Sequence, residues 1–187
     1  MSTALTDKSD GELAAMALAG AQAAYGALMA RHRDVVWRLA MHSVGDADAA
    51  LDIVQETFVA AFAALGRYDA ARPFRAWIAR IALNKCRDWG RRRAVRRFFT
   101  FAQPIEAAID MADAGPTPLE AAEARAELAR VQAAIATLPA TLREVLLLRT
   151  VEEMSQAEVA DLLGISGKAV ETRLYRARSL LSERLEG

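Results

Sequence analysis

The sequence is poor in the residues that cross-link or interrupt a chain. Its 187 residues include one cysteine, five prolines and ten glycines. The single thiol, Cys86, can form neither an internal disulfide nor a multi-cysteine metal site. The two histidines, His32 and His42, do not have metal-ligand spacing with a nearby pair of carboxylates. We therefore expect no metal and no cofactor.

Long hydrophobic runs are also missing. No stretch of about 18 uncharged apolar residues occurs, so we expect no membrane-spanning segment. Residues 1–13 lack the basic region and the apolar region of a signal peptide. Together with the lone cysteine, these features predict a protein of the reducing cytoplasm.

No part of the chain alternates polar residues with valine, isoleucine and threonine in the manner of a β-strand. Apolar residues make up 53% of the sequence and many are alanine, which favours helices. We predict an all-α fold of two small helical domains, residues 1–98 and 117–187. Residues 99–116 are acidic and include two prolines, which predicts a flexible linker.

Charge is balanced overall but unevenly distributed. The chain has 24 Lys and Arg and 24 Asp and Glu, yet residues 67–97 carry eleven basic residues against two acids. Aromatic residues, among them Trp77 and Trp89, are interleaved with these charges. Such a segment predicts a polyanionic partner, first of all nucleic acid, with a solvated helix face as the alternative. Trp77 is expected to pack in the core, because lone aromatics at helical spacing usually do.

The N-terminal domain is predicted to consist of amphipathic helices. Residues 10–43 repeat apolar side chains at helical spacing. Asp46 or Asp48 can cap the next helix, residues 49–65, and Pro73 suits the first turn of the basic helix that follows. In residues 49–65 we expect an inward stripe of Leu51, Val54, Phe58, Ala61, Phe62 and Leu65, and an outward face of Asp52, Gln55, Glu56 and Thr57.

The C-terminal domain has the sequence pattern of a helix-turn-helix. Thr117 and Pro118 predict a helix start, and Ser155 with Glu158 predicts a capping box. Gly164 suits a left-handed turn, after which Ser166 can cap the last helix. In that helix we expect Val170, Leu174, Ala177 and Leu181 to point inward. A helical pair that packs and binds nothing is the alternative.

Both halves resemble parts of one known family. Residues 52–65 (DIVQETFVAAFAAL) and 74–93 (FRAWIARIALNKCRDWGRRR) resemble region 2 of the sigma-70 family, and residues 138–181 resemble region 4. The short acidic segment between them leaves no room for the central domain of housekeeping sigma factors, so the resemblance is to the small extracytoplasmic-function (ECF) type. It implies a protein without catalytic activity that binds core RNA polymerase and directs it to promoters. It also implies an anti-sigma factor that holds the protein until a signal arrives.

The resemblance further implies three sets of site residues. Region 2 would read and melt the −10 element, with a flipped base held by the loop at residues 66–72 and by Asn84. The implied −10 set is Arg67, Tyr68, Arg72, Arg80, Asn84, Lys85, Arg87, Arg91, Arg92 and Arg93. The implied −35 set of region 4 is Ser166, Lys168, Glu171, Thr172, Arg173, Tyr175, Arg176 and Arg178. The implied polymerase-binding set is Asp52, Gln55, Glu56 and Phe58, although Phe58 could instead belong to the core.

Some alternatives stay open. Glu171 stands where many family members carry a basic residue, and it could either accept a hydrogen bond from cytosine N4 or pair with Lys168 or Arg178. An autonomous helix-turn-helix regulator is the second reading of the function. An enzyme is a distant third, because no phosphate loop or catalytic triad pattern is present. We also expect the acidic linker to shield the basic segment in the free chain.

Overall fold

The computed structural model describes residues 3–99 and 118–186, and every regular element within these ranges is a helix. The N-terminal half contains α1 (Thr3–Thr6), α2 (Asp10–Leu18), α3 (Gln22–Val44), α4 (Ala47–Ala63), the short 3₁₀ helix η1 (Leu65–Arg67) and α5 (Phe74–Phe99). The C-terminal half contains α6 (Pro118–Ala136), α7 (Ala140–Thr150), α8 (Gln156–Leu163) and α9 (Gly167–Glu186). The all-α prediction is confirmed. Within the described ranges no helix is long and apolar enough to cross a membrane.

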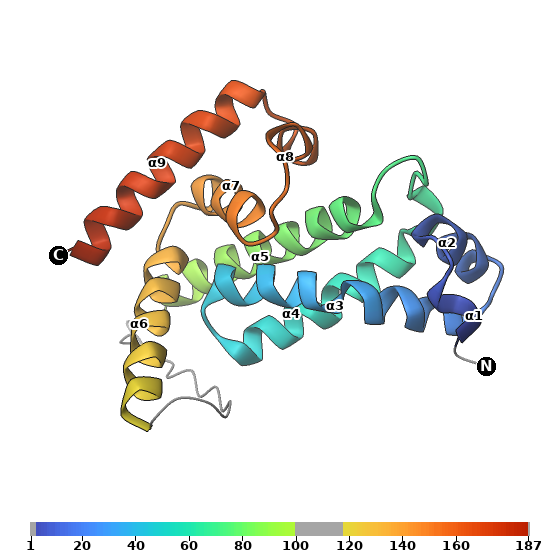
Figure 1. Ribbon diagram of the computed structural model, residues 1–187, viewed down its shortest axis with the longest axis horizontal. Helices are drawn as coiled ribbons and strands as arrows, with labels where there is room; N and C mark the ends of the chain where they lie inside the picture. The colour runs from blue at the N-terminus through green and yellow to red at the C-terminus, as the bar shows by residue number, and fades with distance from the viewer. Residues whose placement is uncertain (1–2, 100–117, 187) are drawn as a thin grey trace.

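The N-terminal domain is built around α3, which packs against α2, α4 and α5. α7, α8 and α9 lie on the opposite side of α5 from α4 (Figure 1). Phe74, the first residue of α5, is 1% exposed and lies in the core with Leu28, Val36 and Ile78. The ring of Trp77 packs against Phe74 with 5.2 Å between centroids, so Trp77 is part of the packing, as predicted.

α4 is rotated relative to the predicted stripe. Leu51, expected inside, is 50% exposed, and Thr57, expected outside, is fully buried. Both predictions were wrong because α4 turns Ala50, Ile53 and Thr57 toward α3 and α5, which leaves Leu51 outside. The buried residues of α4 are Ala50, Ile53, Thr57, Phe58 and Ala61. All but Phe58 are spaced three or four residues apart, and Phe58 directly follows Thr57.

Local capping signals explain where several helices begin. The Asp46 carboxylate accepts a hydrogen bond from the Ala49 N–H at 2.9 Å, so Asp46 rather than Asp48 caps α4. α2 begins with a capping box of Ser9 and Glu12, which the sequence analysis did not predict. These bonds satisfy backbone N–H groups that a helix leaves unpaired in its first turn.

The helix-turn-helix signals are confirmed. The Ser155 hydroxyl accepts from the Glu158 N–H at 3.2 Å, and the Glu158 carboxylate accepts from the Ser155 N–H at 2.7 Å. Gly164 ends α8 with a φ of 67°, and the Ser166 hydroxyl accepts from the Ala169 N–H at 3.1 Å. Val170 and Ala177 are buried, and Leu174 and Leu181 pack against the same core. α6 begins at Pro118 as predicted, while the cap assigned to Thr117 lies outside the described residues.

The two halves share one hydrophobic core. Leu39 of α3 and Leu83 of α5 belong to the same cluster as Leu147 of α7 and Leu162 of α8. α6 also packs against both α3 and α9. The domains are therefore closed on each other. The predicted linker and its expected shielding of the basic segment lie outside the described residues, apart from Phe99 at the end of α5.

The turn of the helix-turn-helix supplies a stability prediction. Gly164→Ala forces an L side chain into the left-handed region and should lower the free energy of unfolding by about 1–2 kcal/mol. Gly26→Ala in α3 is the matched control, because neither glycine has an atom within 4 Å of an added Cβ. Gly26 has ordinary helical geometry, so its replacement should stabilise by roughly 0.5–1 kcal/mol. Chemical denaturation measures the free energy of unfolding of both variants. An equal change in the two would exclude backbone strain as the cause of the loss at Gly164.

Adjacent positions of α4 test which face is core. Phe58 is 4% exposed and Val59 is 65% exposed. Phe58→Ala should lower the free energy of unfolding by about 3–5 kcal/mol through the cavity it leaves. Val59→Ala should change it by no more than about 0.5 kcal/mol. Chemical denaturation measures the free energy of unfolding of both variants. A Phe58→Ala variant about as stable as the parent chain would contradict the packing described for α4.

Candidate DNA and polymerase interfaces

The basic segment forms α5 and the loop before it, and part of its charge is neutralised by α4. Lys85 and Arg92 lie 3.3 Å and 3.6 Å from the two carboxylate oxygens of Glu56. Lys85 also lines a hollow together with Asp52 and Gln55 of the predicted polymerase-binding face. The Lys85 side chain therefore lies with the predicted polymerase-binding residues, whereas the Asn84 side chain lines a different hollow.

Other cations of the −10 set remain closer to solvent. Arg91 pairs with Asp88, which lies one turn earlier in α5. The Arg93 guanidinium lies over the ring of Trp89, with its central carbon 5.0 Å from the ring centroid. Arg67, Arg72 and Arg80 are exposed as well, and the Arg72 Nε lies 3.7 Å from an oxygen of Asp69.

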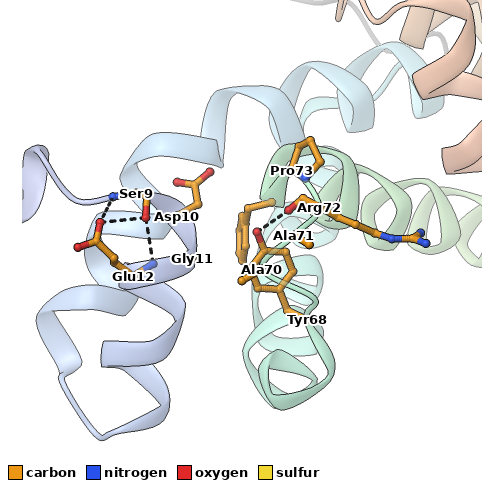
Figure 2. A pocket seen from close by; sticks show the side chains of 10 residues that line it. Ser9, Asp10, Gly11, Glu12, Tyr68, Ala70, Ala71, Arg72 and Pro73 are labelled. Carbon is orange, nitrogen blue, oxygen red and sulfur yellow. Dashed lines mark hydrogen bonds between the residues drawn. The ribbon is translucent and has the colours of Figure 1, made fainter.

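The loop between η1 and α5 borders an open hollow of about 500 Å³. Figure 2 shows the first turn of α2 on one side of this hollow and the loop, with Tyr68, on the other. The Tyr68 hydroxyl donates to the Arg72 carbonyl oxygen at 2.7 Å, which holds the loop in a turn. Gly11 allows the close approach of α2, because a Cβ there would lie 3.2 Å from the Cβ of Ala70. The predicted −10 set contained no residue of α2, yet the first turn of α2 forms one wall of this hollow.

Hydrogen bonds between α3 and Asp10 fix α2 beside this hollow. His32 of α3 is 5% exposed, and its Nε2 lies 2.9 Å from an oxygen of Asp10 in α2. Arg31 donates to the other oxygen of Asp10 at 2.7 Å. Burial lowers the pKa of His32, and the Asp10 carboxylate opposes this only in part. His32 therefore acts as a neutral packing residue. Among the described residues no group of three or more His, Cys, Asp and Glu side chains could hold a metal ion.

Asn84 is separate from the loop that was expected to share a flipped base with it. It lies ten residues into α5 from Phe74, a rise of about 15 Å along the helix. Asn84 lines a second, smaller hollow of about 90 Å³ with Arg80, Arg87 and two leucines of α8. The Asn84 side-chain oxygen accepts from Arg87 at 3.0 Å. The predicted joint pocket of loop and Asn84 is therefore absent from the closed arrangement of the described residues.

Three arginines of the N-terminal half meet carboxylates of the C-terminal half. Arg87 donates through Nε and Nη2 to both oxygens of Glu144 in α7, at 2.5 Å each. Arg38 of α3 donates in the same forked manner to Glu152, at 3.0 Å and 3.1 Å. Arg75 of α5 donates to a Glu152 oxygen at 2.7 Å. The carboxylates raise the pKa of both Arg38 and Arg87, chiefly through these hydrogen bonds. Four of these five residues were not among the predicted site residues, because pairing across halves leaves no signal at fixed spacing.

Three of the four residues predicted to bind polymerase lie on one face of α4, and the fourth does not. Asp52 is exposed, Glu56 is half-buried, and both line a hollow of about 460 Å³. Phe58 was wrongly assigned to this surface, since it points into the core. The apolar part of the face is instead Val59, with Ala60 and Ala63.

The outer face of α9 carries the predicted −35 residues. Tyr175 is 74% exposed, and Arg173 is half-buried. Lys168 and Glu171 form an ion pair of 2.9 Å, which selects Lys168 over Arg178 as the partner of Glu171 in the free chain. The remaining members of the set, Ser166, Thr172, Arg176 and Arg178, are exposed. A hollow of about 410 Å³ runs along this face beside Tyr175.

Comparison with known proteins matches the same two regions. The family models for sigma-70 region 2 and for sigma-70 region 4 match residues 28–96 and 128–181. The RNA polymerase sigma factor CnrH of Cupriavidus metallidurans is 45% identical over 184 residues, which cover 96% of each chain. The ECF RNA polymerase sigma factor SigW of Bacillus subtilis is 28% identical over 171 residues, which cover 89% of this chain and 91% of SigW.

A solved structure agrees with these sequence matches. The structure of CnrH in complex with the cytosolic domain of CnrY has 41% sequence identity to this chain and a TM-score of 0.67. It covers 95% of this chain and 97% of that one. Region 2 therefore precedes region 4 along this chain, and both lie on helices that expose the basic and polar faces described above. The chain belongs to the sigma-70 family and is a sigma factor of the ECF type.

Proposed function

We propose that this sigma factor binds core RNA polymerase through α4, reads the −10 element with α5 and the preceding loop, and reads the −35 element with α9. The observation that carries the proposal is the presence of both DNA-binding regions of one family on a single chain. The sigma-70 family is not an enzyme family, and we assign this chain no catalytic step. Its place of action would be the cytoplasm, where the polymerase works.

The surface chemistry of each element supports its role. The α4 face combines carboxylates with Val59, which suits a basic helical partner on the polymerase. α5 offers a basic track for phosphates and Asn84 for a base edge. α9 presents Tyr175 and Arg176 on an exposed helix preceded by the Gly164 turn, which suits the major groove.

We also propose that an anti-sigma factor controls this protein. CnrH, which is 41% identical in the solved structure, was captured in complex with the cytosolic domain of CnrY. A partner of that kind would have to engage surfaces that the polymerase uses, such as the α4 face.

Run-off transcription on a pool of genomic promoter fragments tests the function directly. Core RNA polymerase together with this protein should produce discrete transcripts that neither component produces alone. Duplex DNA binding by the protein alone, without such transcripts, would favour an autonomous helix-turn-helix regulator instead. Absence of both activities in a preparation free of bound inhibitor would contradict the proposal.

Asn84 separates promoter opening from polymerase binding. Asn84→Ala should impair opening of the −10 element while the affinity for core polymerase stays unchanged, because Asn84 is exposed on α5 and outside the α4 face. Permanganate reactivity of unpaired thymines measures opening, and fluorescence anisotropy measures core binding. If core binding were lost as well, Asn84 would be a structural residue and not a reader of DNA.

Arg176 tests the role of α9. Arg176→Ala should weaken binding of a −35 duplex and reduce the salt dependence of log K by about one unit per lost phosphate contact. Arg184→Ala, near the end of the same helix, is the matched control and should leave binding within twofold. The measurement is a salt titration of duplex affinity, and equal losses for the two variants would contradict a specific role for Arg176.

A further inference from the structure

The outward face of α9 begins with a pair of opposite charges. Lys168 is the second residue of α9 and Glu171 lies one turn later. The Lys168 Nζ is 2.9 Å from a carboxylate oxygen of Glu171, and the two side chains are 81% and 60% exposed. An ion pair between side chains as exposed as these contributes little to stability. Helix α9 lies along one edge of the molecule (Figure 1), so a DNA duplex can approach this pair directly.

The pair lies where a helix-turn-helix contacts base edges. The N-terminal residues of a recognition helix are the ones that enter the major groove. The Ser166 hydroxyl accepts from the Ala169 N–H at 3.1 Å, which fixes the start of α9 directly before Lys168. Lys168, Glu171 and Tyr175 follow one another at steps of three and four, and they line one hollow of about 410 Å³. The face that meets base edges therefore starts with the charged pair.

Two other polar side chains of this face are less suited to the same task. The Thr172 hydroxyl donates its proton to the Lys168 carbonyl oxygen at 2.9 Å, so it has no proton to offer a base. Arg178 lies ten residues beyond Lys168, which is about 15 Å farther along the helix axis. In the first two turns of this face, the charged groups available to a base edge are those of Lys168 and Glu171.

A carboxylate at this place needs a hydrogen-bond donor from a base. It can only accept hydrogen bonds, and the phosphates on either side of the groove repel it. The major groove presents two kinds of donor, the N4 amino group of cytosine and the N6 amino group of adenine. Adenine carries the acceptor N7 beside its donor, and the lone pair of N7 repels a carboxylate. Cytosine has no acceptor at that position, so it is the better partner for Glu171.

The lysine extends this match to the whole base pair. The guanine opposite cytosine presents the acceptors O6 and N7, which a lysine can bind. Cytosine N4 and guanine O6 are joined by a Watson–Crick hydrogen bond, whose ordinary length is about 2.9 Å. The Lys168 Nζ and the Glu171 oxygen have the same separation, 2.9 Å. Donor therefore meets acceptor on both sides at equal spacing, and the groups can close a ring of hydrogen bonds.

We propose that Lys168 and Glu171 act as one unit that reads a single C·G base pair of the −35 element. Glu171 accepts from cytosine N4, and Lys168 donates to guanine O6. The ion pair persists in the complex, which reduces the repulsion between the carboxylate and the phosphates. This inference rests on the proposed function, because it takes α9 as the reader of the −35 element. It names one base pair of the promoter and makes Glu171 a determinant of specificity.

The first test is a selection by the holoenzyme, formed from core RNA polymerase and the full chain, on promoters with a randomised −35 segment. The parent should favour C·G at one position by about tenfold over the other base pairs. Glu171→Gln should move the preference there to A·T, because glutamine pairs with N6 and N7 of adenine. Glu171→Ala should abolish the preference at that position alone. Glu183→Gln, which removes an exposed acid from the same helix, is the matched control and should select as the parent does.

Lys168→Met tests whether the two residues read the same base pair. Methionine keeps an unbranched side chain and removes the charge and the donor. The preference should weaken at the position that Glu171→Ala affects, because both side chains contact one base pair. A loss at another position, or no loss, would overturn the joint reading.

A modified base tests the contact from the side of the DNA. N4-methylcytosine still pairs with guanine, but its methyl group replaces the hydrogen that N4 directs into the major groove. At the selected position it should weaken promoter binding by the parent holoenzyme about tenfold and have no effect on Glu171→Ala. Equal losses in the two would show that the methyl group acts elsewhere and would overturn the proposal.

Affinity for unrelated DNA separates reading from simple repulsion. Loss of the carboxylate should raise the affinity of the Glu171→Ala holoenzyme for a duplex without promoter sequence at low salt, while its affinity for the selected promoter falls. A rise on both duplexes would show that Glu171 only repels DNA and would overturn the proposal.

These outcomes are distinct from failure of the proposed function. A holoenzyme that starts no transcripts would refute the function and this inference together. An active holoenzyme that favours no C·G pair in the −35 segment, or whose preference is independent of Lys168 and Glu171, would refute this inference alone.

Discussion

Burial of Glu152 is the constraint on which the relation of the two halves depends. A carboxylate without solvent contact must meet cations and hydrogen-bond donors, because unpaired buried charge is strongly unfavourable. Arg38 from α3 and Arg75 from α5 supply both. Since these arginines lie on different helices, Glu152 holds the loop after α7 against both α3 and α5. That docking places α8 over the middle of α5, where Leu162 faces the −10 residues.

The charges of this chain are arranged in two tiers. Within the N-terminal domain, Glu56 and Asp88 neutralise part of the basic segment without any residue of the C-terminal half. Across the domains, Glu144 and Glu152 pair with Arg38, Arg75 and Arg87. A protein of zero formal charge can in this way carry a concentrated basic segment whose charges are partly paired. The shielding that the sequence suggested for the acidic linker is performed, in the described part of the chain, by carboxylates of α7 and its following loop.

Much of the fold and part of the site could be predicted, because the interactions that determine them join residues close together in the sequence. The Ser155 capping box, the Gly164 turn and the Ser166 cap depend on atoms within a few residues of one another, so their spacing in the sequence is enough. The inward face of α4 was misjudged at Leu51 and Thr57, because its rotation is set by packing against α3 and α5 and not by its own apolar pattern alone. Phe58 was placed on the polymerase surface only by the family resemblance, and its burial agrees with the predicted inward stripe instead. The wall that α2 contributes to the loop hollow also went unpredicted, since Gly11 and Ala70 are distant in the chain.

By itself the sequence determined the helical class, the order of the two sigma regions, the basic helix and the helix-turn-helix. The order of the sigma regions follows from the family resemblance of the two halves, and the other three follow from composition, periodicity or short-range hydrogen bonding. Only the tertiary structure decided which charges meet. It paired Arg38 with a carboxylate 114 positions away, separated Asn84 from the loop and closed region 4 over region 2. Such pairings depend on how whole helices pack, and side chains that meet only after packing share no periodic pattern along the chain.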